Sequence, residues 1–161
     1  MTEPTLYVTI GPAGAGKSTF VNKMKGVDVI STDQLRKEMF GDEADQHYSG
    51  RVFKAAHEMT RRWLEMGMNV VFDATHTTEK GRKDLLKAVS GVDCRKVALL
   101  FMVSPDECKK RNAQRERKVP EDVIDRHYRQ MMRDAHSIPE QFDEIVVIGG
   151  ENIEEPHFFL H

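Results

Sequence analysis

A glycine-rich stretch near the amino terminus has the residue pattern most directly linked to chemistry. It reads GPAGAGKST, and it matches the P-loop pattern Gly-x-x-x-x-Gly-Lys-Ser. Glycines let the chain curl until backbone N–H groups point at an anion, and the amino-terminal end of a following helix adds positive potential. The pattern therefore predicts a nucleotide-phosphate site formed by the following residues: Gly11, Ala13, Gly14, Ala15, Gly16, Lys17, Ser18 and Thr19.

Two side chains of this loop have specific expected roles. Lys17 would reach the β- and γ-phosphates of ATP, and the Ser18 hydroxyl would bind Mg²⁺. A chance match in a glycine-rich turn is the alternative explanation. The context favours a real site, because an apolar run ends at Ile10 and a helical pattern follows the loop.

A phosphoryl-transfer enzyme also needs a carboxylate beside the acceptor hydroxyl. Asp33 follows a predicted strand that ends at Ser31, so it should lie at the same sheet edge as the P-loop, and it could accept the hydroxyl proton. Arg36, three residues later, would share its helix face and could hold an anionic part of the acceptor. The structural alternative makes Asp33 a helix N-cap and Arg36 a solvated residue.

A second carboxylate, Asp73, ends the next predicted strand. It suits a role in holding Mg²⁺ or a second contact to the acceptor. The spacing leaves open whether Asp33 or Asp73 is the base, and the neighbouring Arg36 favours Asp33. Thr75 and His76 follow Asp73, so they are expected to flank the acceptor, as is the polar loop 41–50.

A basic segment supplies candidate cations for the donor phosphates. Arg111 and Arg115 are four residues apart and should share one helix face, and the segment breaks at Val119-Pro120. A basic helix end followed by a turn and another helix predicts a lid at residues 111–120, which would close over the triphosphate. A merely solvated charged face is the alternative.

Length and composition restrict the class of protein. A chain of 161 residues fits one domain, residues 1–161, and a net charge of −2 argues against a broadly basic surface. Two cysteines, Cys94 and Cys108, predict neither a disulfide framework nor a zinc site and favour a cytoplasmic location. The amino terminus predicts no signal peptide, and no apolar run is long enough to span a membrane.

Short apolar runs that alternate with helical patterns must position these residues. Strands are predicted at 6–10, 27–31, 69–73, 97–103 and 144–148. Helices are predicted between them, one with a buried stripe from Val52 to Met66, one opening at Ser104 and one opening at Pro120. The expected fold is an α/β P-loop NTPase fold: a central parallel sheet flanked by helices on both faces, with a helical lid.

Four segments together resemble the polynucleotide 5'-hydroxyl kinase family, the kinase module of phage polynucleotide kinase and of bacterial RNA-repair enzymes. They read GPAGAGKSTF, STDQLR, VVFDATHTTEKGRKDLL and KKRNAQRERKVPEDVIDRHYRQM. The resemblance implies that Asp33 is the general base, that Arg36 clamps the phosphate next to the terminal nucleoside, and that Arg115 is the lid arginine on the donor phosphates. Larger relatives add a phosphatase or ligase, but this chain has no Asp-x-Asp-Gly-Thr phosphatase motif.

The leading hypothesis is transfer of the ATP γ-phosphate to the 5'-hydroxyl of a DNA or RNA end, with Mg²⁺ as cofactor. The alternatives are a phosphotransferase for a small molecule or a hydroxymethylated DNA base, and a P-loop ATPase module that acts through conformation. DNA or RNA preference, strand form, donor range and oligomeric state are left open by the sequence.

Overall fold

The computed structural model describes residues 3–41, 49–116, 118–149 and 157–160. A sheet with the strand order β2-β3-β1-β4-β5-β6 lies at the centre of these residues. Its strands are β1 (Thr5–Ile10), β2 (Asp28–Ser31), β3 (Val70–Asp73), β4 (Arg95–Met102), β5 (Glu144–Gly149) and β6 (His157–Leu160). The first five are parallel to their neighbours, and β6 pairs antiparallel with β5. The five predicted strands are confirmed, and β6 is a strand that the sequence analysis did not predict.

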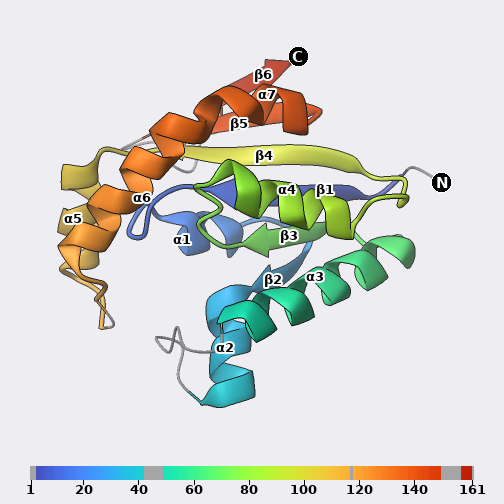
Figure 1. The fold of residues 1–161 in the computed structure, drawn as a ribbon, viewed down its shortest axis with the longest axis horizontal. Coiled ribbons are helices and arrows are strands. Elements are labelled where there is room, and N and C mark those ends of the chain that lie inside the picture. The colour runs from blue at the N-terminus through green and yellow to red at the C-terminus, as the bar shows by residue number, and fades with distance from the viewer. Residues whose placement is uncertain (1–2, 42–48, 117, 150–156, 161) are drawn as a thin grey trace.

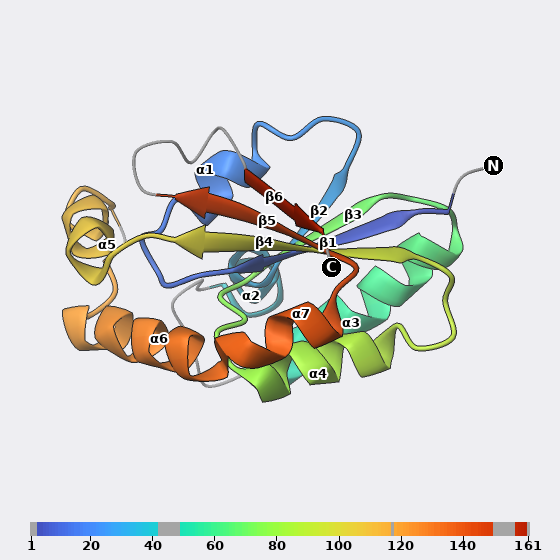
Figure 2. The ribbon, with the colours of Figure 1, turned by 90° about the horizontal axis from the view of Figure 1, so that it is seen from above.

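Helices cover both faces of the sheet, as expected (Figure 2). The helical elements are α1 (Lys17–Val21), α2 (Thr32–Phe40), α3 (Ser49–Glu65), α4 (Glu79–Ala88), α5 (Pro105–Asn112), α6 (Glu121–Asp134), the 3₁₀ turn η1 (Ala135–Ser137) and α7 (Ile138–Gln141). The helices α3, α4, α6 and α7 lie on one face, α1 lies on the other, and α5 stands beyond the carboxyl ends of β4 and β5 (Figures 1 and 2). Within the described residues, no helix is both long and apolar enough to cross a membrane.

The burial of α3 largely follows its sequence pattern. Val52 and Ala56 are fully buried, and Met59 and Trp63 pack against the core from partly buried positions. Met66, however, is 68% exposed, which corrects its predicted place on the buried stripe. The helix ends at Glu65, and Gly67 adopts a left-handed φ of 84° that turns the chain toward β3. Met66 therefore lies in the turn, where helical spacing no longer applies.

The strand register determines which side chains can meet at the carboxyl edge. β3 lies between β1 and β2, with Ser31 paired to Asp73 on one side and Val8 paired to Phe72 on the other. The hydroxyl of Thr9 accepts a hydrogen bond from the Ala74 amide at 3.0 Å, just after β3 ends. The P-loop, Asp73 and the start of α2 consequently lie at one edge of the sheet.

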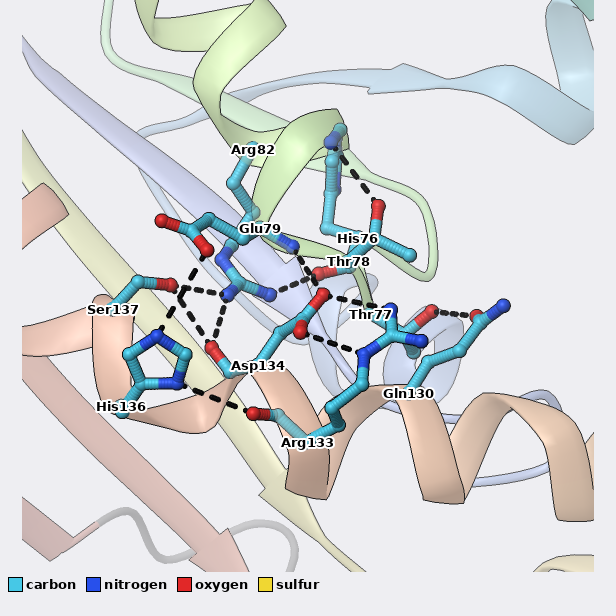
Figure 3. Close-up of polar contacts among 11 residues, drawn as sticks. His76, Thr77, Thr78, Glu79, Arg82, Gln130, Arg133, Asp134, His136 and Ser137 are labelled. Atoms are coloured by element: carbon cyan, nitrogen blue, oxygen red, sulfur yellow. Dashed lines mark hydrogen bonds and ion pairs between the residues drawn. The ribbon is translucent and has the colours of Figure 1, made fainter.

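A fully buried arginine holds the chain that follows β3 (Figure 3). Arg82, on α4, has 0% exposure. Its guanidinium donates hydrogen bonds to the carbonyls of His76 at 2.8 Å and Asp134 at 2.7 Å, to the Ser137 hydroxyl at 3.0 Å and to Gln141 at 2.8 Å. These bonds connect the loop after β3 with the carboxyl-terminal end of α6, η1 and α7.

The carboxylate of Asp134 adds a second connection in the same place. Its Oδ2 accepts a hydrogen bond from the backbone amide of Glu79, at the amino-terminal end of α4, at 2.9 Å. The guanidinium of Arg133 also bonds this carboxylate, and both contacts hold the pKa of Asp134 well below its usual range. Figure 3 shows that these side chains converge from α4 and α6 on one network.

The variant Arg82→Met tests this network. Methionine keeps the apolar stem but leaves buried carbonyl groups without donors, so we expect the free energy of unfolding to fall by about 2–4 kcal/mol. Urea denaturation measures the change. The exposed neighbour Lys83 provides the control, since Lys83→Met should change stability by less than about 0.5 kcal/mol. Equal stability of the two variants would contradict the role of Arg82.

Candidate active site

The P-loop has the context that its pattern requires. β1 ends at Ile10, and α1 begins at Lys17. Gly14 and Gly16 have positive φ angles of 82° and 89°, which other residues adopt only with strain. A Cβ atom on Gly14 would also lie 2.4 Å from the Cys108 carbonyl oxygen on α5. Glycine is thus required at this position both by the turn and by the close approach of α5.

Backbone hydrogen bonds fix the curl of this loop. The Gly11 amide donates to the Thr75 carbonyl at 2.9 Å, which joins the P-loop to the chain after β3. The Ala15 amide donates to the Pro12 carbonyl at 3.2 Å, closing a tight turn. No side chain caps the amino-terminal end of α1, and the first amides of a helix have no acceptor within it. The amides of Lys17, Ser18 and Thr19 can therefore meet a phosphate.

The Lys17 side chain folds back onto the P-loop. Its Nζ donates a hydrogen bond to the Pro12 carbonyl at 2.7 Å. Burial lowers the pKa of Lys17 to about 8, although the charges of Asp73 and, less strongly, Asp33 oppose this change. A bound phosphate would compensate the buried positive charge and raise this pKa again. The Lys17 ammonium thus lies within the P-loop, and its contact with the donor phosphates stays a prediction.

Ser18 and Asp73 form the pair proposed for magnesium. The Ser18 hydroxyl donates a hydrogen bond to Asp73 Oδ2 at 2.9 Å, and burial raises the pKa of Asp73. A hydroxyl and a carboxylate side by side next to a phosphate loop fit Mg²⁺, which takes one or two protein oxygens and completes its shell with phosphate and water. The described residues hold no group of three or more His, Cys, Asp or Glu side chains that could bind a metal ion by themselves. Mg²⁺ at Ser18 and Asp73 would therefore need phosphate oxygens to complete its coordination.

Asp33 and Arg36 face each other on the first turns of α2. Arg36 Nη1 lies 3.0 Å from Asp33 Oδ1. The N-cap of α2 is Ser31, whose hydroxyl accepts a hydrogen bond from the Gln34 amide, so Asp33 is not needed as a cap. Arg36 is 3% exposed, so it is not a solvated helix residue, whereas the Asp33 side chain is 60% exposed. Both structural alternatives for this pair are therefore excluded.

Charge effects place Asp33 near the P-loop. Its carboxylate acts on the pKa of both Lys17 and Asp73, although burial is the largest influence on each. A buried arginine thus holds an accessible carboxylate close to the lysine that would contact the donor. This arrangement suits a base beside the moving phosphoryl group.

Thr75 and His76 have structural contacts at this edge. Thr75 supplies the carbonyl that binds the Gly11 amide. His76 has a φ of 45°, and its Nδ1 lies 3.1 Å from the Thr9 carbonyl oxygen. Its ring packs on Phe72, and burial lowers its pKa to about 3, so it is neutral at physiological pH. The contact of His76 with the acceptor stays a prediction. The polar loop predicted beside the acceptor has residues 42–48 outside the described part of the chain.

The lid region differs from its predicted helical geometry. α5 ends at Asn112, so Arg111 lies in its last turn and Arg115 lies in the following turn. The prediction that both share one helix face is wrong, because the helix stops too early. Arg111 Nη1 donates a hydrogen bond to the Ala15 carbonyl of the P-loop at 2.9 Å. Arg115 is exposed, and its charge contributes to the lowered pKa of Lys17. Arg117 lies outside the described residues.

Asn112 closes the lid loop in a way that the sequence analysis did not foresee. Its side-chain amide donates to the Val119 carbonyl at 2.8 Å, and its Oδ1 accepts from the Val119 amide at 3.0 Å. The side chain is buried, and it brings both ends of the lid loop together before Pro120 starts α6. The only available signal was the position of Asn112 within the Arg-Asn-x-x-Arg motif.

Residues 6–137 match the family model of the AAA domain. The chain belongs to this family. The matched range includes the P-loop, Asp33, Asp73 and the lid, so all the candidate site residues lie within the AAA domain. No curated protein sequence matches the chain.

Solved structures resemble this AAA domain in fold. One in the Pnkp1/Rnl/Hen1 RNA repair complex is 21% identical, with a TM-score of 0.75, and the match covers 86% of this chain and 47% of that one. A gluconokinase from Sinorhizobium meliloti 1021 is 18% identical, with a TM-score of 0.60 and coverage of 92% and 84%. A structure of the PezAT toxin–antitoxin system of Streptococcus pneumoniae is 14% identical, with a TM-score of 0.67 and coverage of 98% and 72%. The domain has a P-loop kinase-like fold, and it spans about half the length of the RNA repair protein.

Proton uptake tests the state of Lys17. Its pKa of about 8 in the empty loop should rise when phosphates bind, so the complex should hold more protons than the free protein between pH 8 and 10. The triphosphate itself is fully ionised there. Calorimetric titration with ATP in buffers of different ionisation enthalpy measures the uptake. The Lys17→Arg variant is the control, because arginine does not titrate in this range. The same uptake in both proteins would contradict the assignment.

Proposed function

We propose that this protein is a polynucleotide 5'-hydroxyl kinase, which transfers the γ-phosphate of ATP to the 5'-hydroxyl end of DNA or RNA. The observation that carries the proposal is the Asp33–Arg36 pair at the carboxyl edge of the sheet, within electrostatic range of Lys17. An accessible carboxylate can accept a hydroxyl proton, and a nearly buried guanidinium beside it can bind an anionic acceptor. A polynucleotide end offers a hydroxyl and a phosphate one nucleoside apart.

The chemical step is an in-line displacement at the γ-phosphorus. The 5'-oxygen forms a bond to phosphorus while the bond to the β,γ-bridging oxygen breaks, and ADP leaves. Asp33 takes the hydroxyl proton, and the Lys17 ammonium together with the backbone amides of Lys17, Ser18 and Thr19 holds the donor phosphates. Ser18 and Asp73 would hold Mg²⁺, which supplies charge neutralisation on the phosphates when bound.

The basic residues of the lid complete the donor site in this proposal. Arg115 is exposed and close enough to influence Lys17, so it can bind phosphate oxygens as charge develops in the transition state. Arg111 holds the P-loop from α5 through the Ala15 carbonyl, which supports a role beside the donor. Residues 1–161 would act as one kinase domain, with the lid at residues 111–120. Thr75 would flank the acceptor.

A phosphotransferase for a small molecule is the second candidate. The specific observation in its favour is that the likeness to a gluconokinase extends over most of both chains. Arg36 could also bind the carboxylate or phosphate of an anionic sugar. The two candidates therefore differ in whether the protein contacts further phosphates of a polynucleotide. A polynucleotide acceptor predicts affinity that grows with strand length and weakens with salt, because contacted phosphates release counterions.

An acceptor assay with γ-labelled ATP tests the proposal. We expect label on a 5'-hydroxyl oligonucleotide and none on the same strand with a 5'-phosphate. Asp33→Asn should lower the transfer rate by about 10²–10⁴-fold, the usual contribution of a general base, with little change in ATP affinity. Asp28, at the opposite end of β2, provides the control, and Asp28→Asn should retain the rate.

Three outcomes would contradict parts of this proposal. Label on gluconate or a nucleoside but on no oligonucleotide would assign a small-molecule acceptor. ATP hydrolysis with no labelled acceptor would indicate an ATPase module. Near-normal transfer by Asp33→Asn would move the base to another residue, with Asp73 as the next candidate.

A further inference from the structure

A histidine of α6 contacts the backbone of the P-loop. His127 lies in the second turn of α6, and its Nδ1 is 3.2 Å from the Ala13 amide nitrogen. The sequence spacing gave no reason to separate this histidine from other polar residues. In the mechanism proposed above, His127 contacts neither the donor phosphates nor the acceptor, so its contact with the loop needs a separate explanation.

The direction of this hydrogen bond fixes the state of the ring. A backbone amide can only donate, so Nδ1 of His127 must be the acceptor and must have no proton. Burial, followed by the nearby charges of Lys17 and Arg126, lowers the pKa of His127 to about 4. The ring is therefore neutral at physiological pH, and its proton lies on Nε2.

The bond completes a set of contacts that hold the P-loop by its backbone. The Ala15 carbonyl accepts from Arg111 of α5, and Gly14 packs directly against the Cys108 carbonyl. The Ala13 amide lies between these contacts and the Gly11 amide, which is bound to Thr75. The side chain of His127 thus fixes the orientation of a peptide unit in the first half of the loop.

The helix that carries His127 is anchored at both ends. Near its start, Asp125 pairs with Lys109 of α5 at 3.0 Å. Farther along, Gln130 accepts a hydrogen bond from the Thr77 hydroxyl at 2.8 Å, and Asp134 binds the amide of Glu79 (Figure 3). Anchored in this way, α6 presents the imidazole of His127 to the P-loop in a defined position.

We propose that His127 is a positioning residue for the donor nucleotide, whose neutral imidazole holds the Ala13 peptide and keeps the P-loop in its phosphate-binding curvature. This inference rests on the proposed function only in that the loop binds a nucleotide. His127 acts through the loop and does not touch the reacting atoms, so its loss should weaken donor binding more than it slows transfer.

Two substitutions separate positioning from packing. His127→Leu fills similar space without an acceptor, and we expect the dissociation constant for MgATP to rise about 3- to 10-fold, as for the loss of one hydrogen bond. His127→Gln keeps a carbonyl acceptor and should restore most of the affinity. The KM for ATP should change in parallel, with kcat nearly unchanged. His136 is exposed, and its contacts are with Glu79 and the Arg133 carbonyl, so His136→Leu is the control.

The results overturn the two proposals separately. Wild-type affinity in His127→Leu, or equal losses in the Leu and Gln variants, would overturn the role of His127. ATP binding without phosphorylation of any oligonucleotide would overturn only the kinase proposal. A wild-type protein that binds no nucleotide would overturn both.

A measurement on the unmodified protein keeps the proposal testable if His127→Leu does not fold. Long-range ¹H–¹⁵N spectra of the histidine rings report the tautomer directly. We expect a neutral His127 with its proton on Nε2 at pH 7, and a proton on Nδ1 or a charged ring would overturn the assignment.

Discussion

The parallel pairing of β3 between β1 and β2 is the constraint on which the site depends. Strand order is not sequence order here: the chain makes β1, then β2 at the edge of the sheet, and then returns to insert β3 between them. This return brings Asp73 beside Ser31 and within reach of Ser18. Without it, the donor loop after β1 and the Asp33–Arg36 pair after β2 would lie next to each other with no carboxylate between them.

The second organising feature is the support behind this edge. α6 contacts the P-loop through His127, and near its other end it contacts the chain after β3 through Gln130 and Asp134. Arg82 binds carbonyls from both segments, at His76 and Asp134. The P-loop and the chain after β3 are thus both attached to α6, which begins where the lid loop ends.

Much of the fold could be predicted from local pattern, because apolar runs of parallel strands and a helical stripe depend on neighbours in the sequence. Asp33, Arg36 and Asp73 were predicted as site residues because they lie at or shortly after the ends of parallel strands, which meet at one edge, and Lys17 was predicted from the P-loop motif. The remaining features depend on contacts between distant residues. The P-loop contact of His127 spans 114 positions, and the bond of Arg82 to Asp134 spans 52, so no spacing rule could reveal them.

Two errors show where local pattern fails. Met66 and Arg115 both stand at the periodic position expected of a helix, but each lies just beyond the helix end. At Met66 the left-handed Gly67 ends the periodicity. At Arg115 the chain leaves α5 because Asn112 binds the backbone of Val119. The helix thus ends at a left-handed glycine in the first case and beside a side-chain contact with the backbone in the second, and neither follows from apolar or charge spacing.

The Asn112 clasp also determines how this protein can vary. An asparagine side chain has an NH₂ donor group beside a carbonyl acceptor, so it pairs with the backbone N–H and C=O of Val119 as a neighbouring strand would. The stem of the lid is closed by this pair whatever lies between, and the entropy of closing a loop grows only slowly with its length. A change of length in this loop would move Arg115, which we propose binds the donor phosphates, while α5 and α6 keep their places. The Asn112 side chain therefore lets loop length reposition the proposed lid arginine without a change in the placement of α5 and α6.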